Sequence, residues 1–482
     1  MSNTAELVFV PVPSMGHMLS TLQLAKLILQ TNQTISISIY IVKLPNATAS
    51  VDTYVESQSR DNPYPTRLTF VTFPPLPNPP DKSATSFSTV LDLYKPIVKK
   101  AIEDRIRDGF PKPVGFVLDM FCTTMLDVAN ELGIPSYVFF TSGANFLNLN
   151  LHAQSLIDDH GVDVVTEFSD PGFTVVVPGF KNPVPSKVIP SSMQLKSPFC
   201  ELIFEFTRRF RKMKGILVNT YAELESLPIQ ALLNSDIHKI PPVYPVGPLV
   251  ELDSKGNAES VIEWLDCQPE SSVVFLCFGR SMGIFDEEQV KEIANGLEKS
   301  GHRFLWSLRK PPPPEGSTEA PSNNNDVFLE ALPEGFIDRT SHIGKIIGWA
   351  PQVAILAHPA IGGFVSHCGW NSTLECLWFG VPMATWPLYA EQQLNAFELV
   401  KELELAVEIR IDYKMDVYTR KGNFLVTAAE IENGVKNLMS MDDEMREKVK
   451  KKSDEGKKAL QGGGSSYNSL GCFIEDVLSN IA

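Results

Sequence analysis

The sequence contains no run of about 18 apolar residues, the length that a membrane-spanning helix needs. Its first apolar stretch, residues 7–12, is too short for a signal peptide, and no basic segment precedes it. Positive charge is also scarce, since 42 Lys and Arg residues face 57 Asp and Glu residues, a formal net charge of −15. We therefore expect a cytoplasmic protein with no membrane span, and the acidic balance argues against nucleic acid as a partner.

Cysteines are few and show no useful spacing. The seven cysteines are odd in number and scattered, which predicts reduced thiols rather than disulfides, and Cys368 and Cys376 lack metal-ligand spacing. No Asp-x-Asp motif stands beside residues 349–392, so we expect no metal requirement. No Gly-x-Gly-x-x-Gly follows the first predicted strand, which argues against a nicotinamide oxidoreductase. We expect no cofactor.

Two successive series of alternating strands and helices are present in the 482 residues. This alternation predicts an α/β protein with two parallel sheets, each covered by helices on both faces. A proline-rich segment, residues 241–248, separates the series and reads as a linker. The predicted domains are residues 1–245 and 246–460, followed by a C-terminal helical segment, residues 461–482.

The expected elements follow from apolar periodicity and from Gly and Pro at their ends. Strands are predicted at residues 6–12, 35–41, 68–73, 114–118, 136–140, 273–278, 303–308, 362–366 and 381–386. Helices are predicted at residues 18–30, 91–107, 123–132, 289–299, 372–379, 391–404, 430–439, 443–460 and 467–481. Ligands of such sheets bind beyond the carboxyl ends of the strands.

Residues 349–392 are the stretch around which the chain is organised. A buried strand leads through a turn of small residues into a helix that Gly380 is placed to end, with Pro382 beyond it. The free N–H groups at the start of that helix form an anion site, and His367, Asn371 and Ser372 add side-chain donors.

Other side chains of this stretch suit a nucleotide joined to a sugar. Trp349 offers a ring on which a base can stack, and Glu375 can accept from both ribose hydroxyls. Trp370, Glu391 and Gln392 can face a polyhydroxylated ring. Simpler interpretations remain open: residues 372–375 also match a Ser-x-x-Glu capping box, Gln392 can cap a helix, and Trp349, Trp370 and Trp386 can be core residues.

Taken together, residues 349–392 resemble the plant secondary-product signature of the family 1 UDP-glycosyltransferases, nearly position for position. The resemblance implies a GT-B fold, in which two Rossmann-like domains face each other across a cleft. It also implies a UDP-sugar donor and an inverting transfer to a small lipophilic acceptor. Donor-binding positions then include Ala350, Gln352 and Gly369. In the family, Gln at the position of Gln392 usually accompanies glucose, and the last helix packs on the N-terminal domain.

The same resemblance extends to the N-terminal half, where His17 and Asp119 each follow a predicted strand. A His at a helix start is disfavoured as a cation, so His17 can act as a neutral base, and Asp119 can hold its ring. A lone His there is often structural, but the segments around both residues look like the family's base and its orienting Asp. The family also places Thr141 near the sugar or the β-phosphate.

One departure from the family's pattern concerns the loop after residues 273–278. The family usually has Phe-Gly-Ser or Phe-Gly-Thr there, and this chain has Phe278-Gly279-Arg280-Ser281. Either Arg280 contacts the diphosphate, or the loop shifts so that Ser281 does, or donor binding is weaker. We assign Ser281 to the donor site.

The acceptor pocket is expected between the domains, with walls from aromatic side chains: Phe87, Phe121, Phe146, Phe199 and Tyr389. Each of these alone also suits a core. Flat phenolics such as flavonoids fit such a pocket, and triterpenes and hormones stay open. The expected function is glucose transfer from UDP-glucose by a monomer. The alternative is a nucleotide-sugar-binding protein that has lost catalysis.

Overall fold

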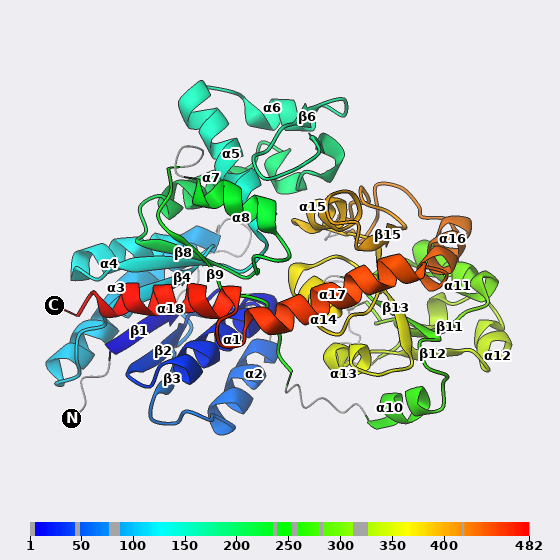
Figure 1. The fold of residues 1–482 in the computed structure, drawn as a ribbon, viewed down its shortest axis with the longest axis horizontal. Coiled ribbons are helices and arrows are strands. Elements are labelled where there is room, and N and C mark those ends of the chain that lie inside the picture. Colours follow the sequence, from blue (N-terminus) through cyan, green and yellow to red (C-terminus); the bar gives the residue numbers. More distant parts are fainter. Residues whose placement is uncertain are drawn as a thin grey trace.

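The structure is a computed structural model that describes residues 5–43, 49–76, 87–234, 239–252, 259–279, 283–311, 326–416 and 419–481. Two parallel sheets form its centre (Figure 1). The first has seven strands in the order β3-β2-β1-β4-β5-β8-β9, and the second has six in the order β12-β11-β10-β13-β14-β15. The α/β class and the parallel sheets agree with the prediction.

The first sheet is built from the N-terminal half of the chain. Its strands are β1 (Ala5–Val10), β2 (Ile35–Ile41), β3 (Leu68–Thr72), β4 (Gly115–Asp119), β5 (Ser136–Phe140), β8 (Gly215–Val218) and β9 (Val243–Pro245). A two-stranded ribbon pairs β6 (Thr174–Val175) with β7 (Val184–Pro185). The isoleucines of β2 alternate, yet nearly every residue of the strand is buried, because both faces of the sheet are covered.

The helices of this half are α1 (Met15–Thr31), α2 (Ala49–Arg60), α3 (Phe87–Arg107), α4 (Leu126–Leu132), α5 (Ala144–His160), α6 (Val164–Ser169), α7 (Pro198–Phe210) and α8 (Ser226–Leu233). Short 3-10 turns are η1 (Thr123–Met125), η2 (Ser186–Val188) and η3 (Ser191–Met193).

The second sheet belongs to the C-terminal half. Its strands are β10 (Val273–Cys277), β11 (Arg303–Ser307), β12 (Gly344–Ile347), β13 (Ile361–Ser366), β14 (Met383–Thr385) and β15 (Ala406–Glu408). Its helices are α10 (Glu259–Asp266), α11 (Glu287–Ser300), α12 (Phe336–Thr340), α13 (Gln352–Leu356), α14 (Trp370–Trp378), α15 (Gln392–Phe397), α16 (Ala428–Met439), α17 (Asp443–Ala459) and α18 (Ser465–Leu478). Two short turns complete it, the 3-10 turn η4 (Leu329–Ala331) and the π-helical turn η5 (Glu398–Glu402).

The predicted linker is partly a strand. Three of its residues form β9, which pairs with β8 at the edge of the first sheet. Proline is tolerated at an edge, since the missing N–H would face no neighbouring strand. The chain therefore leaves the N-terminal sheet only after Pro245.

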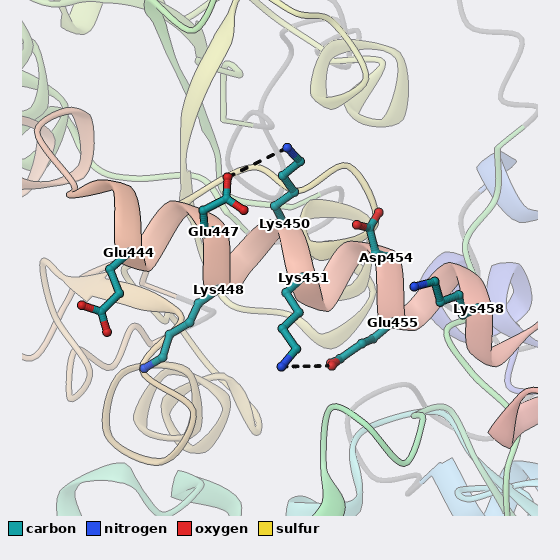
Figure 2. A pocket seen from close by; sticks show the side chains of 8 residues that line it. All are labelled: Glu444, Glu447, Lys448, Lys450, Lys451, Asp454, Glu455 and Lys458. Carbon is teal, nitrogen blue, oxygen red and sulfur yellow. Dashed lines mark ion pairs between the residues drawn. The ribbon is translucent and has the colours of Figure 1, made fainter.

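Helices α17 and α18 run one after the other across the front of the molecule and join its two halves (Figure 1). α17 lies along α14, and its outer face carries alternating charges, among them the ion pair of Glu447 with Lys450 at 3.9 Å (Figure 2). Figure 2 shows a shallow pocket on this face of α17. All the side chains that line it belong to α17, as expected for a helix face in contact with solvent.

α18 packs on the N-terminal sheet. Phe473 is fully buried, and its ring centroid lies 5.0 Å from that of Tyr137 and 5.7 Å from that of Tyr244. The hydroxyl of Tyr137 donates to Oδ2 of Asp476 at 2.6 Å. The last helix is thus fixed on the half of the protein in which the chain begins.

The carboxyl ends of both sheets carry the residues singled out from the sequence. His17, Asp119 and Thr141 stand at or just after the ends of β1, β4 and β5. Trp349 and His367 follow β12 and β13, and the segment that reaches Glu391 follows β14. None of the helices in the described ranges is long and apolar enough to cross a membrane.

We predict that Phe473→Ala lowers the free energy of unfolding by about 3–5 kcal/mol, because it leaves a cavity between α18 and the sheet. Urea denaturation followed by circular dichroism measures this. Tyr467→Ala is the control, since Tyr467 lies on the same helix and is 41% exposed. An equal loss in both variants would show that α18 contributes no packing energy at Phe473.

Candidate active site

His17 and Asp119 form a hydrogen-bonded pair at the carboxyl edge of the N-terminal sheet. His17 lies in the first turn of α1 and Asp119 ends β4, and β1 and β4 are neighbouring strands. Nδ1 of His17 is 2.8 Å from Oδ2 of Asp119. The other carboxylate oxygen, Oδ1, accepts from the backbone N–H of Phe121 at 3.0 Å. The buried carboxylate therefore fixes the ring and leaves Nε2 of His17 for other partners.

The electrostatics of His17 differ from the sequence-based expectation. Burial lowers the pKa of His17, but the charge of Asp119, the hydrogen bond to it and the charge of Glu391 raise it, and the pKa lies above the ordinary value of 6.5. The expected bias toward a neutral ring at a helix start is thus outweighed. The site stabilises the imidazolium that a base forms when it accepts a proton.

The turn after β5 reaches both halves of the protein. Oγ1 of Thr141 is 3.2 Å from Nδ1 of His17. The hydroxyl of Ser142 donates to Oε1 of Glu391 at 3.5 Å. Glu391 belongs to the C-terminal half, and burial raises its pKa, while its own backbone, His17 and Ser142 lower it. Glu391 and His17 consequently face each other across the cleft.

The helix start in the signature is α14, which begins at Trp370 after the N-cap Gly369. Gly369 has no side chain to cap the first turn, so the N–H groups there are open to an anion. The capping-box interpretation of Ser372 and Glu375 is wrong, because the helix starts two residues before Ser372. At the other end, Gly380 has a φ of +68° and stops the helix, as predicted.

His367 lies directly before this helix start and is buried. Burial, followed by the charge of Arg309, lowers the pKa of His367 to about 4, so the ring is neutral. Its Nδ1 has no hydrogen-bond partner among the described residues. A Cβ at Gly279 or Gly369 would lie 2.7 or 2.6 Å from Nε2, so the ring occupies the space that these two glycines leave. A buried neutral imidazole of this kind suits a ligand oxygen.

Gln352 links Ser372 and Glu375. Its Nε2 donates to Oγ of Ser372 at 2.9 Å and to Oε2 of Glu375 at 2.6 Å. The amide thus orients the carboxylate that was assigned to the ribose. Trp349 and Ala350 stand at the end of β12, with Trp349 half-buried.

The core interpretation holds for Trp386. This side chain is fully buried, and its ring centroid lies 5.4 Å from that of Phe278.

Asn371 and Trp370 contact the N-terminal half. Nδ2 of Asn371 donates to the carbonyl of Gly16 at 2.8 Å, and its Oδ1 accepts from Ser20 at 2.9 Å. Nε1 of Trp370 donates to the carbonyl of Asn219 at 2.7 Å, and the residue is 3% exposed. Trp370 therefore holds the start of α14 against the other half, and little of its ring is open to a sugar.

Gln392 begins α15, and its amide is oriented by the protein. Oε1 accepts from the backbone N–H groups of Leu388 at 2.9 Å and Tyr389 at 3.1 Å. The side chain also contacts the hydroxyl of Tyr389. The carbonyl end is thus occupied, and only the NH₂ end can serve a further partner. The interpretation of Gln392 as a cap of the helix that follows is therefore wrong, because Glu391 is the N-cap of α15 and Gln392 binds the turn that precedes it.

Arg309 is a residue of this edge that the sequence did not single out. It follows β11, and its Nη2 donates to the carbonyl of Gly279 at 2.9 Å. This places a guanidinium beside the loop that follows β10. The sequence did contain a signal for Arg309, since a basic residue directly after a predicted strand lies at the edge of the sheet where ligands bind. Arg280 and Ser281, the departure noted in the sequence, lie outside the described residues.

Phe121, one of the residues predicted to form a wall of the acceptor pocket, lies beside His17. Its ring centroid is 5.5 Å from that of His17 and 5.9 Å from that of Phe206. Phe206 was missed because residues 141–240 received no element, although its seven-residue spacing from Phe199 marks one face of α7. Phe199, on the same helix, is 47% exposed.

The other predicted wall residues lie elsewhere. Phe146 is buried against Phe140, with ring centroids 5.7 Å apart. Tyr389 is half-buried beside Gln392. Phe87 starts α3, and its side chain is outside what the structure describes.

The described side chains form no group of three or more His, Cys, Asp and Glu that would hold a metal ion. None of the seven cysteines, all of which lie in the described ranges, forms a disulfide, and five of them are buried. The groups gathered at the cleft can hold a diphosphate by backbone N–H groups and accept a proton at His17.

Comparison with known proteins identifies the family. A family model described as UDP-glucoronosyl and UDP-glucosyl transferase matches residues 205–420. A Fragaria ananassa protein named UDP-glucose flavonoid 3-O-glucosyltransferase 6 is 48% identical over 489 residues, 99% of each chain.

Solved structures agree with this. A transferase from Siraitia grosvenorii in complex with UDP aligns with a TM-score of 0.86 and 45% identity, over 98% of this chain and 100% of that one. Medicago truncatula UGT71G1 complexed with UDP-glucose aligns with a TM-score of 0.85 and 40% identity, over 99% of both chains. The predicted GT-B fold is thereby confirmed, and the chain belongs to the plant UDP-glycosyltransferases, a family of sugar-transferring enzymes.

Proposed function

We propose that this enzyme transfers glucose from UDP-glucose to a hydroxyl of a small phenolic, with inversion at the anomeric carbon. The hydrogen bond between His17 and Asp119 carries the proposal, and Asn371 at the start of α14 donates to the carbonyl of Gly16, the neighbour of His17. The name of the Fragaria ananassa relative, a flavonoid glucosyltransferase, supports glucose as the sugar and a flavonoid as the acceptor.

In the proposed reaction, Nε2 of His17 accepts the proton of the acceptor hydroxyl. The oxygen then forms a bond to the anomeric carbon as the bond from that carbon to the diphosphate breaks, and UDP leaves with the electron pair. Asp119 stabilises the imidazolium through the hydrogen bond at Nδ1. Attack opposite the leaving group gives a β-glucoside.

The donor would lie on the C-terminal half. We assign the uracil ring of UDP to Trp349 and the ribose to Glu375, which Gln352 holds. The diphosphate is assigned to the N–H groups at the start of α14, with His367 and Ser372. Glu391, Gln392 and Thr141 would face the glucose. We propose that no metal is required, since these groups carry the charge of the departing UDP, and that no cofactor takes part.

The acceptor would lie on the N-terminal half, against Phe121 and Phe206. The corresponding domains are residues 1–245 for the acceptor and 246–460 for the donor, with residues 461–482 closing on the first. We further propose that the enzyme is a monomer and that it is cytoplasmic, in line with seven cysteines that form no disulfide.

Incubation with UDP-glucose and a library of flavonoids, simple phenols, triterpenes and hormones, read by mass spectrometry, tests the proposal. A mass gain of one hexose on a phenolic supports it. Gain on triterpenes or hormones alone overturns the acceptor class. Binding of UDP-glucose without transfer to any acceptor would overturn the proposed catalysis.

We predict that His17→Ala lowers turnover of a weakly acidic phenol by roughly 10²–10⁴-fold, because a phenol with a pKa near 10 needs a base at neutral pH. UDP binding, measured by calorimetry, should be unchanged. His358→Ala is the control, since His358 forms a second His–Asp pair, with Asp266 at 3.1 Å. Near-normal turnover by His17→Ala would show that another group is the base.

We predict that Asp119→Asn shifts the pH profile of kcat/KM as well as lowering it. The base must be neutral, so the wild-type kcat/KM rises with pH and levels off above the pKa of His17, which lies above 6.5. Removing the Asp119 charge lowers that pKa, so the rising limb moves to lower pH while the plateau falls. A profile that only drops, without moving, would contradict this electrostatic role.

We predict that UDP-glucose exceeds UDP-galactose in kcat/KM by about 5- to 150-fold, since an axial fourth hydroxyl leaves a buried donor unpaired at a cost of about 1–3 kcal/mol. Gln392→Ala should narrow the gap. Gln393→Ala is the matched control, because its amide donates to the carbonyl of Tyr413 instead. Competition assays with both donors decide, and an unchanged ratio in Gln392→Ala would remove this residue from sugar selection.

A further inference from the structure

Two buried carboxyl groups meet where the halves of the protein touch. Glu225 is the N-cap of α8, and Glu398 begins the π-helical turn η5 that continues α15. The residues are 0% and 1% exposed, and their carboxyl groups lie close enough that each affects the pKa of the other. Neither residue has a role in the proposed reaction.

Glu225 is bound to the start of a helix. Its Oε2 accepts from the N–H of Ala144 at 2.9 Å and its Oε1 from the N–H of Asn145 at 2.7 Å. These donors favour the ionised form. Because α5 directly follows Thr141 and Ser142, Glu225 fixes the turn that reaches His17 and Glu391.

Glu398 has fewer donors. Its Oε1 is buried and accepts no hydrogen bond from the described residues, and the same is true of Oδ1 of Asn145 beside it. The charged groups around Glu398 are Glu225 from the N-terminal half and Glu402 from its own turn. No cation in the described part of the chain is among the groups that shift the pKa of either carboxyl. Tyr221 faces Glu225, and burial raises the pKa of its phenol.

Two buried carboxylates in contact repel each other, so such a pair retains one proton. Burial and the charge of Glu225 raise the pKa of Glu398 well above its ordinary value. A proton on Glu398 removes the repulsion and supplies the donor that the neighbouring buried oxygens lack.

Each carboxyl group of the pair is connected to a segment that we assign to the glucose. Glu398 is on the continuous helical segment that starts at Gln392, directly after Glu391. Glu225 holds the start of α5, directly after Thr141 and Ser142. The contact between Glu225 and Glu398 therefore sets the position of Glu391 and Gln392 relative to the turn of Thr141 and Ser142.

We propose that Glu398, held as a carboxylic acid against Glu225, is a positioning residue that fixes Glu391 and Gln392 against the Thr141–Ser142 turn. Closure of the two halves around the sugar donor then requires one proton at this pair. The inference rests on the proposed function for the roles of Glu391 and Gln392.

Closure that depends on a proton at this pair must weaken as pH rises. In the open or unfolded chain the carboxyl has a pKa of about 4.3, so the closed form binds more protons above that pH. Closure is fully stabilised at low pH and weakens as pH rises through the higher pKa of the closed form. Above that point, affinity for UDP-glucose should fall by at most about tenfold per pH unit.

The test compares the wild type with Glu398→Gln, which stays neutral and can still donate, and with Glu398→Ala. KM for UDP-glucose and the midpoint of thermal unfolding are measured from about pH 6 to about pH 9. Glu404→Gln is the control, because it removes the same charge near the end of the same helical segment, where Glu404 pairs with Lys448 at the surface.

We expect KM of the wild type and of Glu404→Gln to rise with pH relative to that of Glu398→Gln, whose interface does not titrate. The titration of His17 affects all the variants equally, so it cancels when KM of the wild type is compared with KM of Glu398→Gln at each pH. Glu398→Ala should show a raised KM throughout, with kcat less affected, and Glu398→Gln should restore it. Thermal midpoints should diverge in the same direction.

Parallel pH profiles for the wild type and Glu398→Gln would overturn the shared proton. Diverging thermal midpoints with parallel KM profiles would reduce the pair to a structural contact and overturn the positioning role. If no phenolic is glucosylated, the proposed function fails, and calorimetric binding of UDP-glucose over the same pH range then decides the positioning role by the same comparison.

Discussion

The hydrogen bond between His17 and Asp119 depends on the register of a parallel sheet. Val10 pairs with Leu118, so the ends of β1 and β4 stand side by side and the residues that follow them meet. The second sheet repeats the arrangement, because Cys277 pairs with Ser366 and brings Gly279 beside His367. In both sheets the strand order reverses at this point, which leaves a crevice at the carboxyl edge. The site is the place where two such crevices face each other.

The same edges also hold the two halves together. Trp370 donates to Asn219, Asn371 donates to Gly16, and Glu402 accepts from the N–H groups of Lys181 and Asn182. Trp370, Asn371 and Gly16 stand close in the sequence to groups assigned to the donor and to the catalytic base, His367, Ser372 and His17. The contact between the halves and the proposed site therefore share neighbouring residues of the chain.

Local patterns predicted much of the fold, and their failures have physical causes. The ends of the expected strands agree with the structure to within a few residues, and Gly380 ends α14 because it adopts a left-handed conformation. The start of α14 was placed too late, since Gly369 caps the helix without a side-chain signal. β8, β9, β12 and β15 were missed because short strands give too few residues for a period to be read.

The sequence by itself determined the family, the two-sheet architecture and most of the residues at the carboxyl edges, because these depend on local periodicity and on a contiguous signature. Only the tertiary structure decided which groups act on one another. Burial lowers the pKa of His17, but Asp119, 102 positions away, and Glu391 together raise it above its ordinary value. Phe121 meets Phe206 because η1 and α7 pack together. The contact of Glu225 with Glu398 joins residues of different halves. Burial and distance are set by packing between distant segments, and no spacing along the chain encodes them.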